Sequence, residues 1–304
     1  MLPATAGPLD TIRAMERIRA TASDLPPRVG AALANPTAGV RRTVDVDGLA
    51  WATLRWGDPD ASPVLLVHGV TSDSDTFWRI GPAIGASGRH VVAVDLPGHG
   101  RTQGWRGRHR FAETAADLAA FIRAAGLDRR DLSVLGHSWG GMVVAGLPAA
   151  GLRPATLILL DPPVLPRAGM ELMTRDPSER HYDDLGEAIG VIRASYPGWT
   201  EGDVLAKAEG LHRFDVDAAR AVLLDNGDWD AGLAALADPA AAVVPVWYIR
   251  GEFANGSLIP ESNVPALAAR AGVDHVLTIA DGAHSPHRMH PEATVLAILR
   301  AISG

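Results

Sequence analysis

The stretch Leu132–Ala150, LSVLGHSWGGMVVAGLPAA, has the pattern of a buried strand, an abrupt turn and a helix. The turn carries GHSWG at residues 136–140, which is the spacing G-x-S-x-G. Glycines flank the serine because a strand that turns directly into a helix crowds its neighbours and forces unusual backbone angles. The same five letters without such flanks would be only a glycine-rich turn. In this context they predict that Ser138 is a nucleophile with an exposed hydroxyl.

Similar apolar runs of strand length occur on both sides of this stretch. They are PVLLVHG, HVVAVDLPG, ATLILLDPP, VPVWYIRG and DHVLTIADG, and most are separated by segments of helical composition. Upstream, VDVDGLAWATLRW contains Asp47-Gly48, which favours a hairpin turn. Strands that are apolar throughout and alternate with helices predict a mostly parallel sheet covered on both faces. In such α/β folds, ligands bind beyond the carboxyl ends of the strands.

One segment interrupts the alternation. Residues 162–228, after the sixth strand, are far too long for an ordinary crossover and have the composition of several short helices. We predict a helical cap there, over the carboxyl edge of the sheet, inserted into a core formed by residues 43–161 and 229–304. Trp78, Trp105, Trp139 and the aromatic residues of the insertion suggest an apolar pocket, and the alternative for each is a place in the core.

Residues 1–42 look like a separate N-terminal extension. Leu9, Ile12, Met15 and Ile18 recur at helical spacing, and a connector rich in proline and glycine, DLPPRVGAALANPTAG, follows them. The pattern predicts a helical extension outside the core.

Composition excludes several classes of protein. The net charge of -7 argues against a general nucleic-acid binder. No apolar run approaches the roughly 18 residues that span a membrane, and the N-terminus lacks the pattern of a secretory signal. The chain has no cysteine, which excludes disulfides and thiolate ligands. We expect a cytoplasmic enzyme without a cofactor; whether it forms a homodimer stays open.

A second motif places hydrogen-bond donors near the serine. LLVHGVTSDSDTFW puts His68-Gly69 at the end of an earlier strand. A tetrahedral oxyanion needs two preorganised N–H donors. We predict that the backbone amides of Val70 and Trp139 supply them, and that His68 is a buried histidine that shapes the loop.

The order of these motifs resembles one superfamily. HGVT, DLPGHGRT, GHSWGG, GEFANGSLIP and DGAHSPHRMHPEA follow one another as in the α/β-hydrolase fold, among its serine esterases and lipases with a cap domain. The resemblance runs from about Thr43 to the end of the chain. It implies that the histidine after the last strand, His284, is the general base.

Two further histidines, His287 and His290, follow His284 at intervals of three residues. On a helix such positions drift by about 60° each, so the three side chains do not converge on one ion. Pro286 and Pro291 also interrupt a helix there. We therefore predict no metal site, and we assign His287 and His290, like His99, to supporting or surface roles.

The acid of the expected triad departs from the usual pattern of the family. The family usually places it a few residues after the G-E that ends the seventh strand, but Ala254, Asn255 and Gly256 are not acidic. Some members carry it instead at the end of the sixth strand, where this chain has Asp161. We predict Asp161, with Glu252 and Asn255 as alternatives.

These residues predict a Ser-His-Asp hydrolase that cleaves carboxylic esters or lactones through an acyl-serine intermediate. The expected substrate is a small ester-like molecule with an apolar part. A serine nucleophile argues against epoxide hydrolases, which use an aspartate. Alternatives are an amidase or peptidase, a C–C hydrolase, a metal-dependent hydrolase, or a ligand-binding protein with little catalysis.

Overall fold

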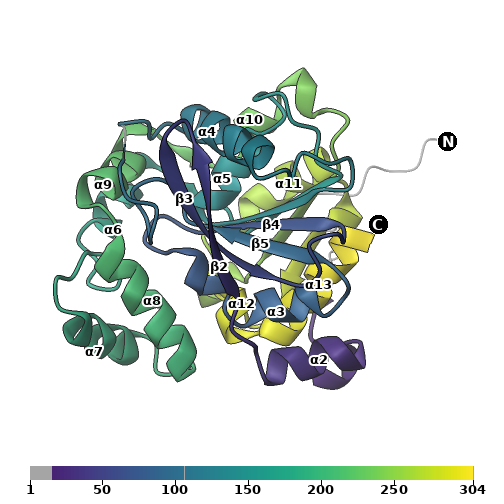
Figure 1. Ribbon diagram of the computed structural model, residues 1–304, viewed down its shortest axis with the longest axis horizontal. Coiled ribbons are helices and arrows are strands. Elements are labelled where there is room, and N and C mark those ends of the chain that lie inside the picture. Colours follow the sequence, from purple (N-terminus) through teal and green to yellow (C-terminus); the bar gives the residue numbers. More distant parts are fainter. Residues whose placement is uncertain (1–15, 106, 304) are drawn as a thin grey trace.

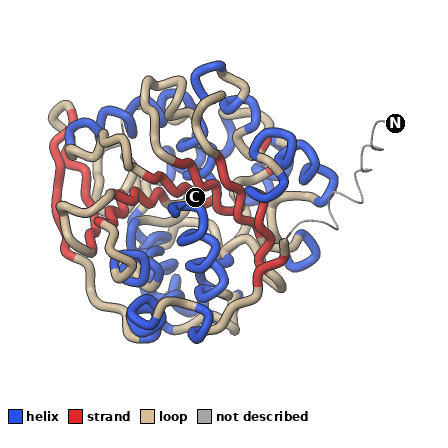
Figure 2. Tube along the Cα trace, turned by 90° about the vertical axis from the view of Figure 1, so that its right-hand side faces the viewer, coloured by secondary structure: helices blue, strands red, loops and turns tan. Residues whose placement is uncertain are grey.

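A twisted nine-stranded sheet forms the centre of the computed structural model, which describes residues 16–105 and 107–303 (Figures 1 and 2). Its spatial order is β1-β11-β10-β7-β6-β4-β5-β3-β2, and only the pairs β2–β3 and β3–β5 are antiparallel. The strands are β1 (Arg17–Ile18), β2 (Val40–Val46), β3 (Leu49–Trp56), β4 (Pro63–Val67), β5 (His90–Val94), β6 (Ser133–His137), β7 (Thr156–Leu160), β10 (Val246–Arg250) and β11 (Val276–Ile279).

The central strands are buried on both faces because apolar side chains point alternately to two separate cores. On β4, Leu65 and Val67 join one hydrophobic cluster, whereas Val64 and Leu66 join the other. Helices α4 (Phe111–Ala124), α5 (Trp139–Ala145) and α11 (Val264–Ala271) cover the first face. Helices α2 (Pro27–Ala34), α3 (Ile80–Gly85) and α13 (Pro291–Ser303) cover the second. Figure 2 shows helices on either side of the sheet. The mostly parallel sheet covered on both faces, predicted from the sequence, is confirmed.

The N-terminal segment differs from the prediction. Ile18 lies in β1, where it pairs in parallel with Ile279 of β11, so the helical spacing was misleading at this residue. The open edge of β11 offers unpaired backbone groups, and Ile18 is buried when it joins that edge. Leu9, Ile12 and Met15 lie outside the described residues. The expected connector contains α2, which begins with Pro27 at its first helical position.

The long segment between β7 and β10 folds mainly as helices. Its two ends meet in a small antiparallel ladder, β8 (Val164–Leu165) with β9 (Trp229–Asp230). Between them lie α6 (Arg167–Met173), α7 (Leu185–Ser195), α8 (Glu201–Arg213) and α9 (Val216–Asp225). These four helices gather on one side of the molecule (Figure 1). Buried residues of α7, α8 and α9 join the same core as α4 and α5.

Short elements complete the chain. They are α10 (Leu233–Leu236), α12 (Pro286–Met289), η1 (Ala22–Asp24), η2 (Ser74–Phe77), η3 (Pro239–Ala241), η4 (Phe253–Asn255), η5 (Glu261–Asn263) and η6 (Val273–His275). Within the described part of the chain, every helix is too short or too polar to cross a membrane.

Candidate active site

The turn after β6 has the strained geometry that its glycines predict. Ser138 adopts φ 55° and ψ −122°, a region that residues with a side chain rarely occupy. A Cβ atom on Gly136 would lie 2.2 Å from the carbonyl oxygen of Gly140, and one on Gly140 would lie 2.5 Å from that of Val67. Both positions therefore require glycine. The tight packing turns the chain from β6 into α5 within one residue and fixes Ser138 at the carboxyl edge of the sheet.

Three side chains predicted from different parts of the sequence form one hydrogen-bonded chain. The Oγ atom of Ser138 lies 3.0 Å from Nε2 of His284, and Nδ1 of His284 lies 2.7 Å from Oδ2 of Asp161. His284 follows β11, and Asp161 follows β7. The carboxyl ends of parallel strands meet at one edge, which is why residues so distant in sequence come together. This geometry lets the imidazole accept the proton of the serine hydroxyl.

The carboxylate of Asp161 is completely buried, and both of its oxygens accept hydrogen bonds. Its Oδ1 accepts hydrogen bonds from the amide of Gly251 at 3.0 Å and from Oγ of Ser257 at 2.6 Å. Its Oδ2 accepts from the amide of Leu258 at 3.0 Å, in addition to His284. Because these hydrogen bonds fix the position of the carboxylate, Asp161 can orient the imidazole of His284.

The two alternative acids occupy different surroundings. Glu252 pairs with Arg17, and its Oε2 accepts a hydrogen bond of 3.0 Å from the Asn255 side chain. Neither Glu252 nor Asn255 contacts His284 among the interactions of the described residues. Of the three candidates, only Asp161 touches the imidazole.

The loop after β4 lies directly against the serine. A Cβ atom built on Gly69 would be 3.6 Å from Oγ of Ser138. Within the described residues, the amides of Val70 and Trp139 donate to no backbone carbonyl. Trp139 is the first residue of α5, where helical N–H groups lack partners inside the helix. Both amides are therefore available for an oxyanion.

Two buried histidines hold this loop. Nε2 of His68 accepts the amide proton of Leu96 at 3.0 Å, which leaves Nδ1–H to donate to the carbonyl of Gly69 at 2.8 Å. Burial lowers the pKa of His68 to about 4, so the ring is neutral. Nε2 of His99 donates to the carbonyl of Val70 at 2.6 Å. As predicted, His68 is a buried histidine bonded to the backbone.

A further histidine, His137, contacts His284. Nε2 of His137 donates to the backbone carbonyl of His284 at 2.9 Å, and its ring lies beside those of His284 and His287. Burial lowers the pKa values of His137 and His287 well below the ordinary value. His137 is the residue between glycine and serine in the motif, and nothing in the sequence marks it as a contact of His284.

The histidines of the C-terminal motif do not form a metal site. His287 is buried against Thr76, whereas Nε2 of His290 donates to the carbonyl of Asp281 at 3.1 Å. In residues 16–105 and 107–303, no three metal-ligating side chains converge on a common point.

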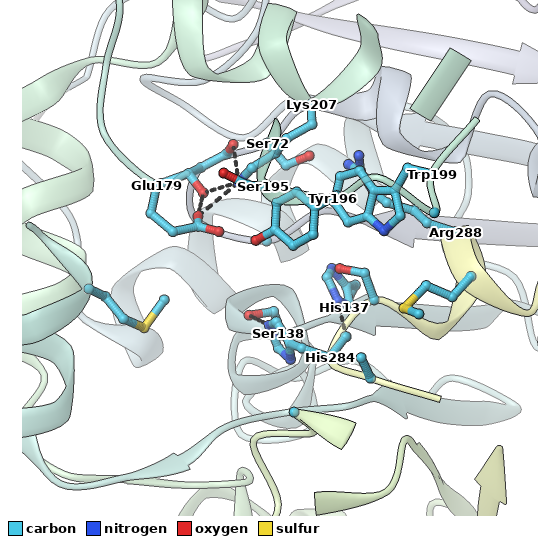
Figure 3. A pocket seen from close by; sticks show the side chains of 18 of the residues that line it. Ser72, His137, Ser138, Glu179, Ser195, Tyr196, Trp199, Lys207, His284 and Arg288 are labelled. Carbon is cyan, nitrogen blue, oxygen red and sulfur yellow. Dashed lines mark hydrogen bonds and ion pairs between the residues drawn. The ribbon is translucent and has the colours of Figure 1, made fainter. Parts of the chain in front are cut away.

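A cavity of about 500 Å³ opens in front of Ser138 and His284. Figure 3 shows Lys207, Glu179, Tyr196 and Trp199 across this cavity from the serine and the histidine. Tyr196 and Trp199 stack with ring centroids 4.0 Å apart. Trp139 and Trp105, also considered from the sequence, do not line it. Much of the cavity wall opposite Ser138 comes from the inserted segment.

Hydrogen bonds from Lys207 connect the inserted segment to the loop after β4. Nζ of Lys207 donates to Oγ1 and the carbonyl of Thr71 at 2.7 and 3.3 Å, and it lies 2.8 Å from Oε2 of Glu179. Thr71 Oγ1 also donates to Glu179. Burial lowers the pKa of Lys207, and Glu179 opposes that effect. Nothing in the residue pattern predicts this contact, since a lysine in a mixed helix ordinarily faces solvent.

Comparison with known proteins agrees with the fold. A family model for the alpha/beta hydrolase fold matches residues 62–230, and the chain belongs to this family. Epoxide hydrolase A of Mycobacterium tuberculosis is 31% identical over 134 residues, which cover 43% of this chain and 41% of that protein. Non-heme chloroperoxidase of Burkholderia pyrrocinia is 34% identical over 116 residues, covering 36% of this chain and 41% of that protein.

The chain thus matches about two fifths of the length of these relatives. The solved structure of E-2-(acetamidomethylene)succinate hydrolase superposes with a TM-score of 0.72 at 20% identity, covering 88% of this chain and 100% of that chain. At this identity the likeness concerns the fold alone.

Proposed function

We propose that this protein is a serine hydrolase that cleaves carboxylic esters or lactones. The observation that carries the proposal is the continuous hydrogen-bonded chain Ser138–His284–Asp161 beside a cavity. A serine hydroxyl becomes a useful nucleophile when an oriented imidazole takes its proton. The relative that is an epoxide hydrolase does not change this choice, because displacement on an epoxide calls for a carboxylate at the position of Ser138.

The chemistry proceeds in two halves. Ser138 Oγ attacks the ester carbonyl carbon while its proton moves to Nε2 of His284, and the amides of Val70 and Trp139 bind the resulting oxyanion. The imidazolium then gives its proton to the leaving alcohol, and acyl-Ser138 remains. Water attacks the acyl group with His284 again as base, which releases the acid and restores the serine. Asp161 keeps the imidazole in the required tautomer throughout.

The lining of the cavity supports a small substrate with an apolar part. Met173, Tyr196 and Trp199 offer apolar surface for an acyl chain. No cofactor takes part in the proposed reaction, and the proposed partner is the substrate alone.

A substrate panel with an inactive variant tests the proposal. Wild-type protein and Ser138→Ala are assayed on 4-nitrophenyl esters of graded acyl length, on lactones and on the matching anilides. We expect ester and lactone turnover by the wild type only, and an acyl adduct on Ser138 in the mass spectrum after rapid quenching. Equal activity of Ser138→Ala would refute the serine mechanism. Faster anilide cleavage would favour an amidase, and no turnover or adduct would favour a ligand-binding protein.

A further inference from the structure

The protein buries three cationic side chains among its described residues: Lys207, Arg250 and Arg288. A buried charge without a partner is strongly unfavourable, because it loses its hydration. Two of the three have a carboxylate. Lys207 pairs with Glu179, and Nη1 of Arg250 lies 2.9 Å from Oε2 of Glu261.

Arg288 has no such carboxylate. Its Nη1 donates to the backbone carbonyl of Asp203 at 2.8 Å and its Nη2 to Oγ1 of Thr76 at 2.7 Å, both neutral acceptors. Its guanidinium carbon lies 4.5 Å from the ring centroid of Trp199. Within residues 16–105 and 107–303, no carboxylate lies at ion-pair distance from Arg288, and its Nε–H has no hydrogen-bond partner.

The carboxylate with the largest compensating effect on Arg288, that of Asp203, already has other hydrogen-bond partners. The carboxylate of Asp203 accepts hydrogen bonds from Nε1 of Trp78 at 3.0 Å and from Oγ1 of Thr200 at 2.6 Å. Burial lowers the pKa of Arg288, and the charges of Asp203 and Glu179 offset this only from a distance. A guanidinium nevertheless stays protonated at neutral pH.

The unpaired cation lines the cavity that contains Ser138. Arg288 and Lys207 contribute two positive charges to the cavity wall, and Glu179 contributes one negative charge, so the lining carries a net positive charge. Figure 3 shows Arg288 beside Trp199, on the other side of the cavity from Ser138. The stacked rings of Tyr196 and Trp199 also line the cavity, so its wall combines apolar surface with the unpaired cation.

We propose that Arg288 binds a carboxylate of the substrate, so that the preferred substrates are esters or lactones whose acyl part carries a carboxylate. This inference rests on the proposed function and names its substrate class. An acyl chain that begins at Ser138 and packs along Tyr196 and Trp199 brings its far end to the cationic wall. The substrate carboxylate then supplies the counter-charge that the protein gives to its other two buried cations.

A pair of esters that differ only in charge tests this assignment. Mono-(4-nitrophenyl) adipate ends in a carboxylate, whereas 4-nitrophenyl methyl adipate ends in a neutral methyl ester. We expect kcat/KM for release of 4-nitrophenol to be about 10- to 100-fold higher for the charged ester, the size of one hydrogen bond between charged groups. Equal or lower kcat/KM for the charged ester would overturn the assignment.

Variants locate the effect. Arg288→Met should abolish the preference, and Arg288→Lys should keep part of it because the charge remains. Arg193→Met is the control, since Arg193 is an exposed arginine of α7 in the inserted segment and pairs with Glu201. It should keep the full preference. Circular dichroism melts establish that each variant is folded. If Arg288→Met does not fold, Arg288→Lys and the wild-type pair of esters still decide the matter.

A binding measurement separates this inference from the proposed function. Ser138→Ala retains the cavity, and calorimetry compares monomethyl adipate with dimethyl adipate as ligands. Tighter binding of the monoanion, lost in Ser138→Ala/Arg288→Met, supports the carboxylate site even if no ester is hydrolysed. Hydrolysis of both esters at equal rates, with no preference in binding, would leave the serine hydrolase intact and overturn only the carboxylate site.

Discussion

Two carboxylates end neighbouring parallel strands of this sheet, Asp161 after β7 and Glu252 after β10, and their surroundings differ completely. Leu160 pairs with Ile249, so the two strand ends lie side by side. Asp161 is fully buried and accepts three hydrogen bonds besides that of His284. The Glu252 side chain is 18% exposed and faces Arg17 and Asn255.

The loop after β10 explains the difference. In this chain its amides of Gly251 and Leu258 and the hydroxyl of Ser257 all donate hydrogen bonds to Asp161. An acid needs such donors to remain ionised while buried. The absence of an acidic residue from 253 to 260 is therefore matched by hydrogen bonds to the carboxylate of the adjacent strand. A candidate acid and the hydrogen-bond donors to its carboxylate therefore have to be considered together.

We expect the largest loss of activity when the imidazole of His284 is removed, because this is the group that Asp161 or Glu252 would orient. His284→Ala should lower kcat on a 4-nitrophenyl ester by about 10⁴- to 10⁶-fold, because Ser138 then has no base. His290→Ala is the control and should keep most activity, since His290 contacts only a backbone carbonyl near the surface. Steady-state kinetics with both purified variants measures the contrast. A His290→Ala variant as damaged as His284→Ala would show that the base is misassigned.

Asp161→Asn tests directly whether the buried carboxylate is the triad acid. We expect kcat to fall by about 10⁴-fold with little change in KM, because the amide no longer fixes the tautomer or stabilises the imidazolium. The same ester assay measures the loss, and a circular dichroism melt checks that the variant is folded. Activity within a few-fold of wild type would rule out Asp161 as the acid.

The donors to Asp161 should matter less than the acid itself. Ser257→Ala removes the 2.6 Å hydrogen bond to Oδ1, and we expect kcat to fall by about tenfold, the size of one hydrogen bond to a charged group. Ser262→Ala is the matched control, because Ser262 is exposed and its hydroxyl contacts Asn263. If both variants retain full activity, the carboxylate does not depend on this donor.

Glu252→Gln should have the smallest effect. Its partner Arg17 is largely exposed, and an ion pair of this kind contributes about 0–1 kcal/mol. We expect kcat to change by less than about twofold, measured beside Asp161→Asn on the same ester. A large loss of kcat in Glu252→Gln, together with a nearly unchanged kcat in Asp161→Asn, would show that Glu252 is the acid.

Much of the fold could be predicted because its signals are local. Apolar runs that alternate with helices indicate a parallel sheet, and the glycines around Ser138 mark a turn that other residues cannot adopt. The prediction failed at Ile18, where a helical spacing over a few residues competed with an open sheet edge. A short segment adopts the structure that its neighbours in the fold stabilise, because an isolated short helix is only marginally stable. The boundaries of the cap stay a prediction.

The sequence by itself left Asp161, Glu252 and Asn255 open as the acid, but it determined the elbow at Ser138 and the position of His284 after the last strand. These follow from local backbone sterics and from the order of motifs. Only the tertiary structure decided which side chains surround them. His137 donates to the carbonyl of His284, Lys207 donates to Thr71 of the loop after β4, and Arg288 lines the cavity without a carboxylate partner. Contacts between residues far apart in sequence depend on distances of a few ångström, and these distances are set only when the helices pack.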